Sequence, residues 1–183
     1  MKKVILGIDP GTNILGFSVI EIEGNKIRLI EVNVLHMQKG GTHHEKLKEI
    51  FDGIQRVVKK FTPQEVAIEA PFFGKNVQSM LKLGRAQGVA ITVALSQEIP
   101  VFEYSPRKIK QSITGNGNAS KEQVAAILSH LLQFDSKHLL LDATDALGVA
   151  VCHHFQNRDL SSSKKISGWK KFVTENPGRV KLP

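Results

Sequence analysis

Apolar and polar residues along the chain follow first a strand-like pattern and then a helical one. Three runs rich in β-branched and other apolar residues come first, over residues 3–9, 14–23 and 26–36, and each is typical of a strand. Gly24-Asn25, between the second run and the third, suits a tight hairpin turn. The pattern therefore predicts that the chain begins with an antiparallel three-stranded meander.

Helical spacing starts after the third run. Apolar side chains recur three and four positions apart over residues 43–61, which predicts an amphipathic helix that ends before Pro63. A short strand is expected over 65–69, a long helix over 76–96 and a further strand over 101–104. Because a helix precedes each of these two strands, both are expected to join the sheet as parallel strands.

Three more helices complete the expected fold. The first covers residues 106–113 and has proline at its first position, where proline is favoured. The second covers residues 121–132 behind a capping serine, Ser120, and the last spans roughly 142–155. This order is typical of an α/β fold: a mixed five-stranded sheet, part antiparallel meander and part parallel, flanked by helices.

The composition changes near residue 156. Residues 1–155 carry the expected strands and helices and are taken as one domain, whereas residues 156–183 hold seven basic and two acidic residues with little apolar periodicity. This basic C-terminal tail supplies much of the formal net charge of +8. Such a charge favours an anionic partner, most commonly nucleic acid, although charge alone is equally compatible with a protein that has no such partner.

Cysteine and histidine content limits the other chemistries. Cys152 is the single cysteine, so the chain forms no internal disulfide and no all-cysteine zinc site. His43-His44 and His153-His154 are adjacent pairs without zinc-ligand spacing, and we expect them at the surface or in packing. The sequence has neither a signal-peptide pattern nor a stretch near the roughly 18 apolar residues of a membrane span, so a cytoplasmic protein is expected.

Four acids occupy positions where carboxylates are uncommon. Asp9 and Glu69 each end an apolar strand, while Asp142 and Asp145 open an apolar helix. Each position has an ordinary structural explanation: Asp9 can stabilise the following turn, Glu69 can face water, and Asp142 suits the positive end of a helix. Four such acids in one small basic chain nevertheless indicate a shared role, because acids rarely lie in apolar segments unless something pairs with them.

We expect the four acids to meet at one edge of the sheet, because α/β sheets bind their ligands at strand ends that lead into crossovers. Asp142 and Asp145 are three positions apart and therefore share one helix face. Bare carboxylates would repel one another, and oxygen-only ligands suit Mg²⁺ or Mn²⁺. Two such ions would clamp a phosphodiester and activate water, so the acids indicate a metal-dependent enzyme that acts on a polyanion.

At these residues the chain closely resembles the RuvC family of Holliday-junction resolvases, the crossover junction endodeoxyribonucleases. The resemblance runs in chain order through about residues 1–155. It consists of five blocks, which are residues 7–12, 67–76, 81–90, 100–111 and 142–147. Any one block is unspecific, whereas the ordered set is highly specific and marks residues 1–155 as a RuvC-like nuclease domain.

The resemblance implies a ribonuclease-H-like fold and a homodimer that nicks two opposed strands of a four-way DNA junction in recombination and repair. It implies magnesium dependence and a partnership with the RuvA-RuvB branch-migration complex. Catalytic and metal-binding roles in the family fall on Asp9, Glu69, Asp142 and Asp145. The junction-opening aromatic of the family falls on Phe72, and its basic DNA contacts near the cleavage site fall on Lys110 and Lys121.

The segment after Glu69 suits unpaired bases. Phe72-Phe73 stands in an expected loop, and an exposed aromatic ring stacks on a base with about 1–3 kcal/mol. Lys75, in the same matching block, is expected to contact DNA as well. The alternative is that both rings belong to the core; we expect one buried and one exposed.

Lysines form a second group of expected DNA contacts. Lys108, Lys110 and Lys121 flank the glycine-rich loop 115–118, which can adapt to a phosphate backbone. The alternative is an ordinary solvated basic face, which is the usual situation of surface lysines.

Three other functions compete with junction resolution. Actin-like ATPases and sugar kinases share the opening Gly-Ile-Asp motif, but they need two large lobes and this chain is too short for them. A junction-binding module without chemistry has no need of four clustered acids. Another nuclease of the same superfamily would act on RNA-DNA hybrids or other branched DNA, and the Phe72 segment and the long helix over 76–96 favour junctions instead.

Overall fold

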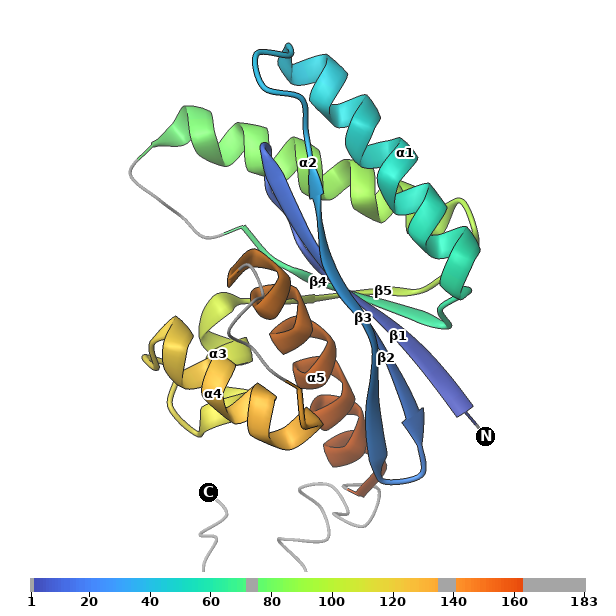
Figure 1. The fold of residues 1–183 in the computed structure, drawn as a ribbon, viewed down its shortest axis with the longest axis vertical. Coiled ribbons are helices and arrows are strands. Elements are labelled where there is room, and N and C mark those ends of the chain that lie inside the picture. The colour runs from blue at the N-terminus through green and yellow to red at the C-terminus, as the bar shows by residue number, and fades with distance from the viewer. Residues whose placement is uncertain (1, 72–75, 135–140, 163–183) are drawn as a thin grey trace, which may run out of the picture.

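The computed structural model describes residues 2–71, 76–134 and 141–162. Within them one five-stranded sheet runs through the molecule in the order β3-β2-β1-β4-β5 (Figure 1). β1, β2 and β3 pair antiparallel, and β4 and β5 add parallel strands beside β1, which confirms the predicted mixed sheet. The strands are β1 (Lys2–Asp9), β2 (Ile14–Glu23), β3 (Lys26–His36), β4 (Glu65–Glu69) and β5 (Val101–Tyr104).

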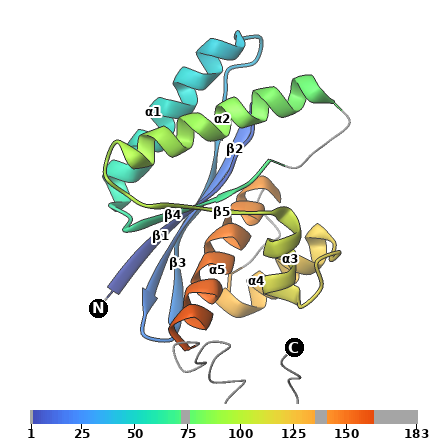
Figure 2. The ribbon, with the colours of Figure 1, turned by 180° about the vertical axis from the view of Figure 1, so that it is seen from behind.

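Helices cover both faces of this sheet, as Figures 1 and 2 show from opposite sides. One face carries α1 (His43–Phe61) and α2 (Val77–Leu95). The other face carries α3 (Pro106–Thr114), α4 (Lys121–Leu132) and α5 (Leu141–Ser162). Among the residues that the structure describes, no helix combines the length and the apolar character that crossing a membrane requires.

The helices begin where local sequence favours it. Thr42 and Ser120 each form a capping box, with Glu45 and Gln123 respectively, and so satisfy backbone N–H groups that have no partner inside the helix. Pro106 occupies the first turn of α3, where its missing N–H costs no hydrogen bond. These signals explain why the predicted starts of α1, α3 and α4 agree with the structure.

The last helix is longer than the sequence pattern indicated. The prediction ended it near residue 155, whereas α5 continues to Ser162. Residues 156–162 contain neither glycine nor proline, so nothing in them interrupts a helix. The side chain of Asn157 also lies against the sheet, where its amide donates to Glu65 Oε2 at 3.2 Å.

The sheet separates one hydrophobic cluster on the side of α1 and α2 from two on the side of α3, α4 and α5. Leu6 and Ile8 of β1 pack on the side of α1 and α2, whereas Ile5 packs on the other side with Leu147 of α5. Side chains alternate along a strand. Asp9, an even number of residues after Ile5, therefore points to the same face as Ile5, which is the face that α5 covers. The alternation of β1 therefore decides which helices the first acid meets.

Candidate active site

Two of the four acids lie side by side at one edge of the sheet. β1 and β4 are parallel neighbours, and their last paired residues are Ile8 and Ile68. Asp9 and Glu69, one position further on, are the final residues of their strands. The register of the two strands thus brings these carboxylates together, as the sequence predicted.

The other two acids reach the same edge because α5 approaches the sheet very closely. A Cβ atom on Gly16 would lie 2.0 Å from the carbonyl oxygen of Asp142, and one on Gly7 would lie 2.3 Å from that of Ala146. Ser18 Oγ donates a buried hydrogen bond of 2.9 Å to the same Ala146 carbonyl. Small residues on β1 and β2 therefore allow the first turns of α5 to pack directly onto the strands.

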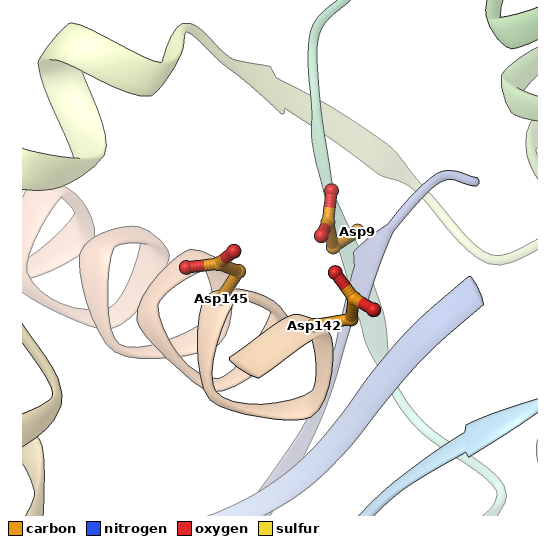
Figure 3. A group of neighbouring side chains, drawn as sticks. All are labelled: Asp9, Asp142 and Asp145. Carbon is orange, nitrogen blue, oxygen red and sulfur yellow. The ribbon is translucent and has the colours of Figure 1, made fainter. Parts of the chain in front are cut away.

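Three carboxylates converge at this point. Asp9, Asp142 and Asp145 each offer an oxygen atom, and these atoms all lie within 4.8 Å of one another; Figure 3 shows the three side chains meeting between the end of β1 and the first turns of α5. Glu69 is not a member of this group, but it lines a cavity of about 190 Å³ together with Asp9 and Asp145. The structure therefore gives a cluster of three acids with the fourth beside it.

The surroundings of this cluster favour protonated carboxyl groups. Burial, together with the nearby charges of Glu69 and Asp145, raises the pKa of Asp9 from 3.8 to about 8. Burial and the charge of Asp145 raise the pKa of Glu69 from 4.5 to about 7. Both shifts are those of carboxylates that are withdrawn from water and crowded together, so the cluster strongly favours a positive charge in its midst.

Lysines supply part of that positive charge. The ammonium group of Lys121, at the start of α4, pairs with Asp145, and although burial alone would lower the pKa of Lys121, this hydrogen bond and charge raise it. Lys110 of α3 lines the same cavity. Lys108 is exposed and is not among the residues that line the cavity, so the structure brings two of the three predicted lysines to the acids.

The predicted aromatic segment lies outside the described residues, and so do its three members Phe72, Phe73 and Lys75. The chain leads into it through Ala70 and Pro71, which line a second hollow of about 200 Å³ beside Asp9 and Glu69. Leu83 of α2 forms another part of that wall. An apolar-sided hollow therefore adjoins the acids where the chain enters this segment.

Two contributors to the site were missed from the sequence. Gly16 determines how close α5 comes, and no local pattern announces that contact. Gln87 of α2 is buried among apolar residues, and its amide donates to Glu103 Oε2 at 2.7 Å and to the carbonyl oxygen of Glu69 at 3.5 Å. A glutamine on the core-facing side of a helix is a signal that sequence reading can recognise.

The donor set fits a hard divalent cation. The converging ligand atoms are carboxylate oxygens, which suit magnesium or manganese rather than zinc or copper. Buried acids with raised pKa values also gain most from a bound cation, because it replaces the protons that otherwise neutralise them. Pro106, Ile109 and Val124 give the cavity an apolar wall, which limits the water that competes for such an ion.

This combination of sheet, helices and acidic edge is that of a nuclease with a ribonuclease-H-like fold. The family model described as "Crossover junction endodeoxyribonuclease RuvC" matches residues 5–153. The chain therefore belongs to the RuvC family of crossover junction endodeoxyribonucleases.

Individual relatives agree with this assignment. A crossover junction endodeoxyribonuclease RuvC of Cytophaga hutchinsonii is 58% identical over 181 residues, which cover 99% of this chain and 90% of the relative. The enzyme of the same name from Porphyromonas gingivalis is 50% identical and is covered to 98%, as is this chain. Among solved structures, Thermus thermophilus RuvC in complex with a Holliday junction substrate is 32% identical with a TM-score of 0.80, covering 86% of this chain and 96% of that one.

Proposed function

We propose that this protein is a crossover junction endodeoxyribonuclease that resolves four-way DNA (Holliday) junctions during recombination and repair by nicking two opposed strands. The convergence of Asp9, Asp142 and Asp145 within 4.8 Å carries the proposal, because it supplies a hydrolytic centre for a phosphodiester in a chain of this family. The formal net charge of +8 supports binding to a polyanion. The junction substrate is supported by the complex known for the Thermus thermophilus relative.

The acids are proposed to hold the metal. Asp9, Asp142 and Asp145 would bind one Mg²⁺, and Glu69 with Asp9 would bind a second, with Mn²⁺ able to replace either. Asp9 is suited to serve both because it offers an oxygen within 4.8 Å of those of Asp142 and Asp145 and lines two hollows together with Glu69. Such ions, when bound, activate a water molecule and stabilise the leaving oxygen of the phosphodiester.

The lysines are proposed to hold the DNA backbone beside the acids. Lys110 and Lys121 line the same cavity as Asp9, Glu69 and Asp145 and would bind phosphate oxygens there. Lys108, more exposed on α3, would contact a phosphate further along the strand.

The segment after Pro71 is proposed to open the junction. Phe72 or Phe73 would stack on an unpaired base, and Lys75 would bind the adjoining phosphate. The hollow formed by Pro71 and Leu83 next to Asp9 supports this role, because a base displaced from its stack needs an apolar surface close to the acids.

A homodimer is proposed to provide the two active sites that symmetric nicking needs. α2 exposes a seam on the side away from the sheet, where Val77, Leu81 and Leu95 are 66%, 57% and 56% accessible. Gly84 and Gly88 lie on the same seam with open space where a side chain would project. These positions follow coiled-coil spacing, so two copies of α2 can pack closely along it.

The remaining expectations are proposals on the same basis. Residues 1–155 would form the nuclease domain and residues 156–183 a basic tail, whose first residues the structure places in α5. The RuvA-RuvB complex would be the partner that delivers the junction. The cytoplasm, where chromosomal DNA lies in bacteria, would be the compartment.

A substrate panel tests the proposed function. Synthetic four-way junctions, matched linear duplexes and RNA-DNA hybrids are incubated with the protein in Mg²⁺ or in EDTA. The expected result is paired nicking of the junction alone, in Mg²⁺ alone. Preferential cleavage of the hybrid would assign the chain to another activity of the superfamily. Cleavage in EDTA would contradict the proposed metal dependence.

A further inference from the structure

A second polar cluster lies in the interface between α5 and the sheet, remote from the acids. His153 is fully buried, at 0% exposure. Its Nδ1 lies 2.7 Å from the hydroxyl of Tyr104 on β5, and its Nε2 lies 2.5 Å from Glu65 Oε2 on β4. Lys3 of β1 reaches the same Glu65 oxygen at 2.6 Å. One side chain of α5 is thus linked to three strands of the sheet.

The protonation of this cluster is defined by its contacts. Burial alone would raise the pKa of Glu65, but its hydrogen bonds with Lys3 and His153 outweigh burial and lower it, so the carboxylate is ionised and only accepts. Nε2 of His153 therefore carries the proton that it donates to Glu65, and Nδ1 accepts from the Tyr104 hydroxyl. Burial lowers the pKa of His153, which keeps the ring neutral. Both ring nitrogens are satisfied in this one position of the side chain.

The other contacts of α5 are less selective about its position along the sheet. Several residues of its buried face are small, and a shift by one helical turn of about 5.4 Å would bring Ala150 to the position of Ala146, so this pair does not distinguish the two arrangements. The hydrogen bond from Ser18 ends on a backbone carbonyl, and every turn of the helix offers such a carbonyl. Small residues of this face are Ala143, Ala146, Val149 and Ala150.

The distances along the two elements match. Glu65 and Glu69 are four residues apart on β4, which is about 13 Å, and Asp145 and His153 are eight residues apart on α5, which is about 12 Å. When His153 contacts Glu65 at one end of β4, the equal spacing therefore places Asp145 beside Glu69 at the other end. A one-turn shift would move Asp145 by more than the 4.8 Å within which its oxygen now meets those of the other acids.

We infer that His153 is a positioning residue, which fixes the register of α5 on the sheet through Glu65 and Tyr104 and so holds Asp142 and Asp145 at the metal site. The inference rests on the proposed function, since it concerns the geometry of that site. His153 itself touches neither metal nor DNA in this role. A buried polar group of this kind selects one arrangement among similar ones, even where it adds little stability.

The test replaces His153 with leucine, which fills the space without hydrogen bonds. Mn²⁺ affinity is measured by titration calorimetry without DNA, alongside thermal unfolding, junction affinity and single-turnover cleavage. Outer contacts that orient metal ligands typically change affinity by about ten- to a hundredfold. We expect His153→Leu to weaken Mn²⁺ binding and slow cleavage by such a factor while junction affinity stays unchanged. Wild-type Mn²⁺ affinity in folded His153→Leu would overturn the inference.

Two further variants keep the test decisive. Cys152→Ala, at the neighbouring buried position of α5, leaves a cavity and should lower the melting temperature without altering Mn²⁺ affinity. If His153→Leu does not fold, Glu65→Gln replaces it, with weaker Mn²⁺ binding expected and unchanged binding contradicting the inference. Asp142→Asn separates the two proposals. If it binds Mn²⁺ as wild type does, the proposed metal site is wrong. If Asp142→Asn loses Mn²⁺ binding and His153→Leu keeps it, only the positioning role of His153 is refuted.

Discussion

Lys121 at the start of α4 forms an ion pair with Asp145 on α5, inside the cavity that the proposed metal ligands line. The ammonium group therefore occupies space beside the acids where a cation is expected to bind. The side chain of Lys121 is half exposed, so it can leave Asp145 and turn toward solvent or a phosphate. Lys121 thus pairs with Asp145 in the metal-free protein, and we propose that it contacts DNA once a metal ion is bound.

Replacing this lysine should separate metal binding from cleavage. Lys121→Met removes the competing ammonium group, so Mn²⁺ should bind the free protein severalfold more tightly; a half-exposed ion pair contributes at most about 1 kcal/mol. Cleavage of junctions should nevertheless slow, because a phosphate contact is lost. Calorimetry and single-turnover assays measure the two effects, with Lys108→Met as a matched lysine outside the cavity. Weaker Mn²⁺ binding by Lys121→Met would contradict this role.

The raised carboxyl pKa values predict a pH-dependent stability of the metal-free protein. Burial and neighbouring acids raise the pKa of Asp9 from 3.8 to about 8 in the folded protein and the pKa of Glu69 from 4.5 to about 7. At these two acids the folded state therefore holds more protons than the unfolded chain between these limits, so their contribution to stability falls as pH rises from about 4 to 8. Melting temperatures measured in EDTA should decline over this range.

The same experiment has two controls. Asp9→Asn should make the decline shallower, whereas Asp52→Asn, which changes an acid of α1 far from the cavity, should leave it as it is. Added Mn²⁺ should raise the melting temperature most at the alkaline end, because bound protons no longer compete there. A difference in melting temperature between wild type and Asp9→Asn that stays constant between pH 5 and 8 would show that the acids are not crowded as described.

The exposed seam of α2 predicts the oligomeric state. Leu81→Glu places a charge within the proposed dimer contact, where each copy would face the other. The wild-type protein should be a dimer by light scattering after size-exclusion chromatography, and Leu81→Glu should be a monomer. Ile127→Glu, at an exposed apolar position of α4, serves as the control and should stay dimeric. A monomeric wild-type protein, or a dimeric Leu81→Glu variant, would contradict the proposed dimer contact along α2.

The observed length of α5 changes how the basic tail is best tested. Truncation at residue 156 would remove part of α5 and its contact from Asn157 to Glu65, so the cut belongs after Ser162. The salt dependence of junction binding should then become shallower, with each lost phosphate contact reducing the logarithmic slope by about 0.9. An unchanged slope would show that the tail makes no phosphate contacts. The segment removed carries six basic residues, which are Lys164, Lys165, Lys170, Lys171, Arg179 and Lys181.

The order of strands and helices was predictable because the determinants are local. β-branched runs, the turn at Gly24 and the caps at Thr42 and Ser120 each act within a few residues. The parallel placement of β4 beside β1 followed from the helix between them. The end of α5 differs from the prediction because a basic composition does not end a helix, and residues 156–162 contain no glycine or proline that would.

The acids themselves were also predictable, but not how they meet. Asp9 and Glu69 were recognisable as polar residues closing apolar strands. The approach of Asp142 depends on Gly16, more than a hundred residues away in the sequence, and such a contact leaves no local pattern. His153 was expected either at the surface or in packing, and the structure shows it buried. Its partners Glu65 and Tyr104 become visible only once β4, β5 and α5 are placed in space.

The most direct test of the central claim is single-turnover cleavage of a synthetic four-way junction by Asp142→Asn in Mg²⁺, at protein concentrations that saturate binding. Because this substitution removes one of the three converging carboxylates and leaves the basic surface intact, we predict wild-type junction affinity with a cleavage rate lower by about a hundredfold or more. Cleavage near the wild-type rate would contradict the assignment of these acids as the metal-binding catalytic centre.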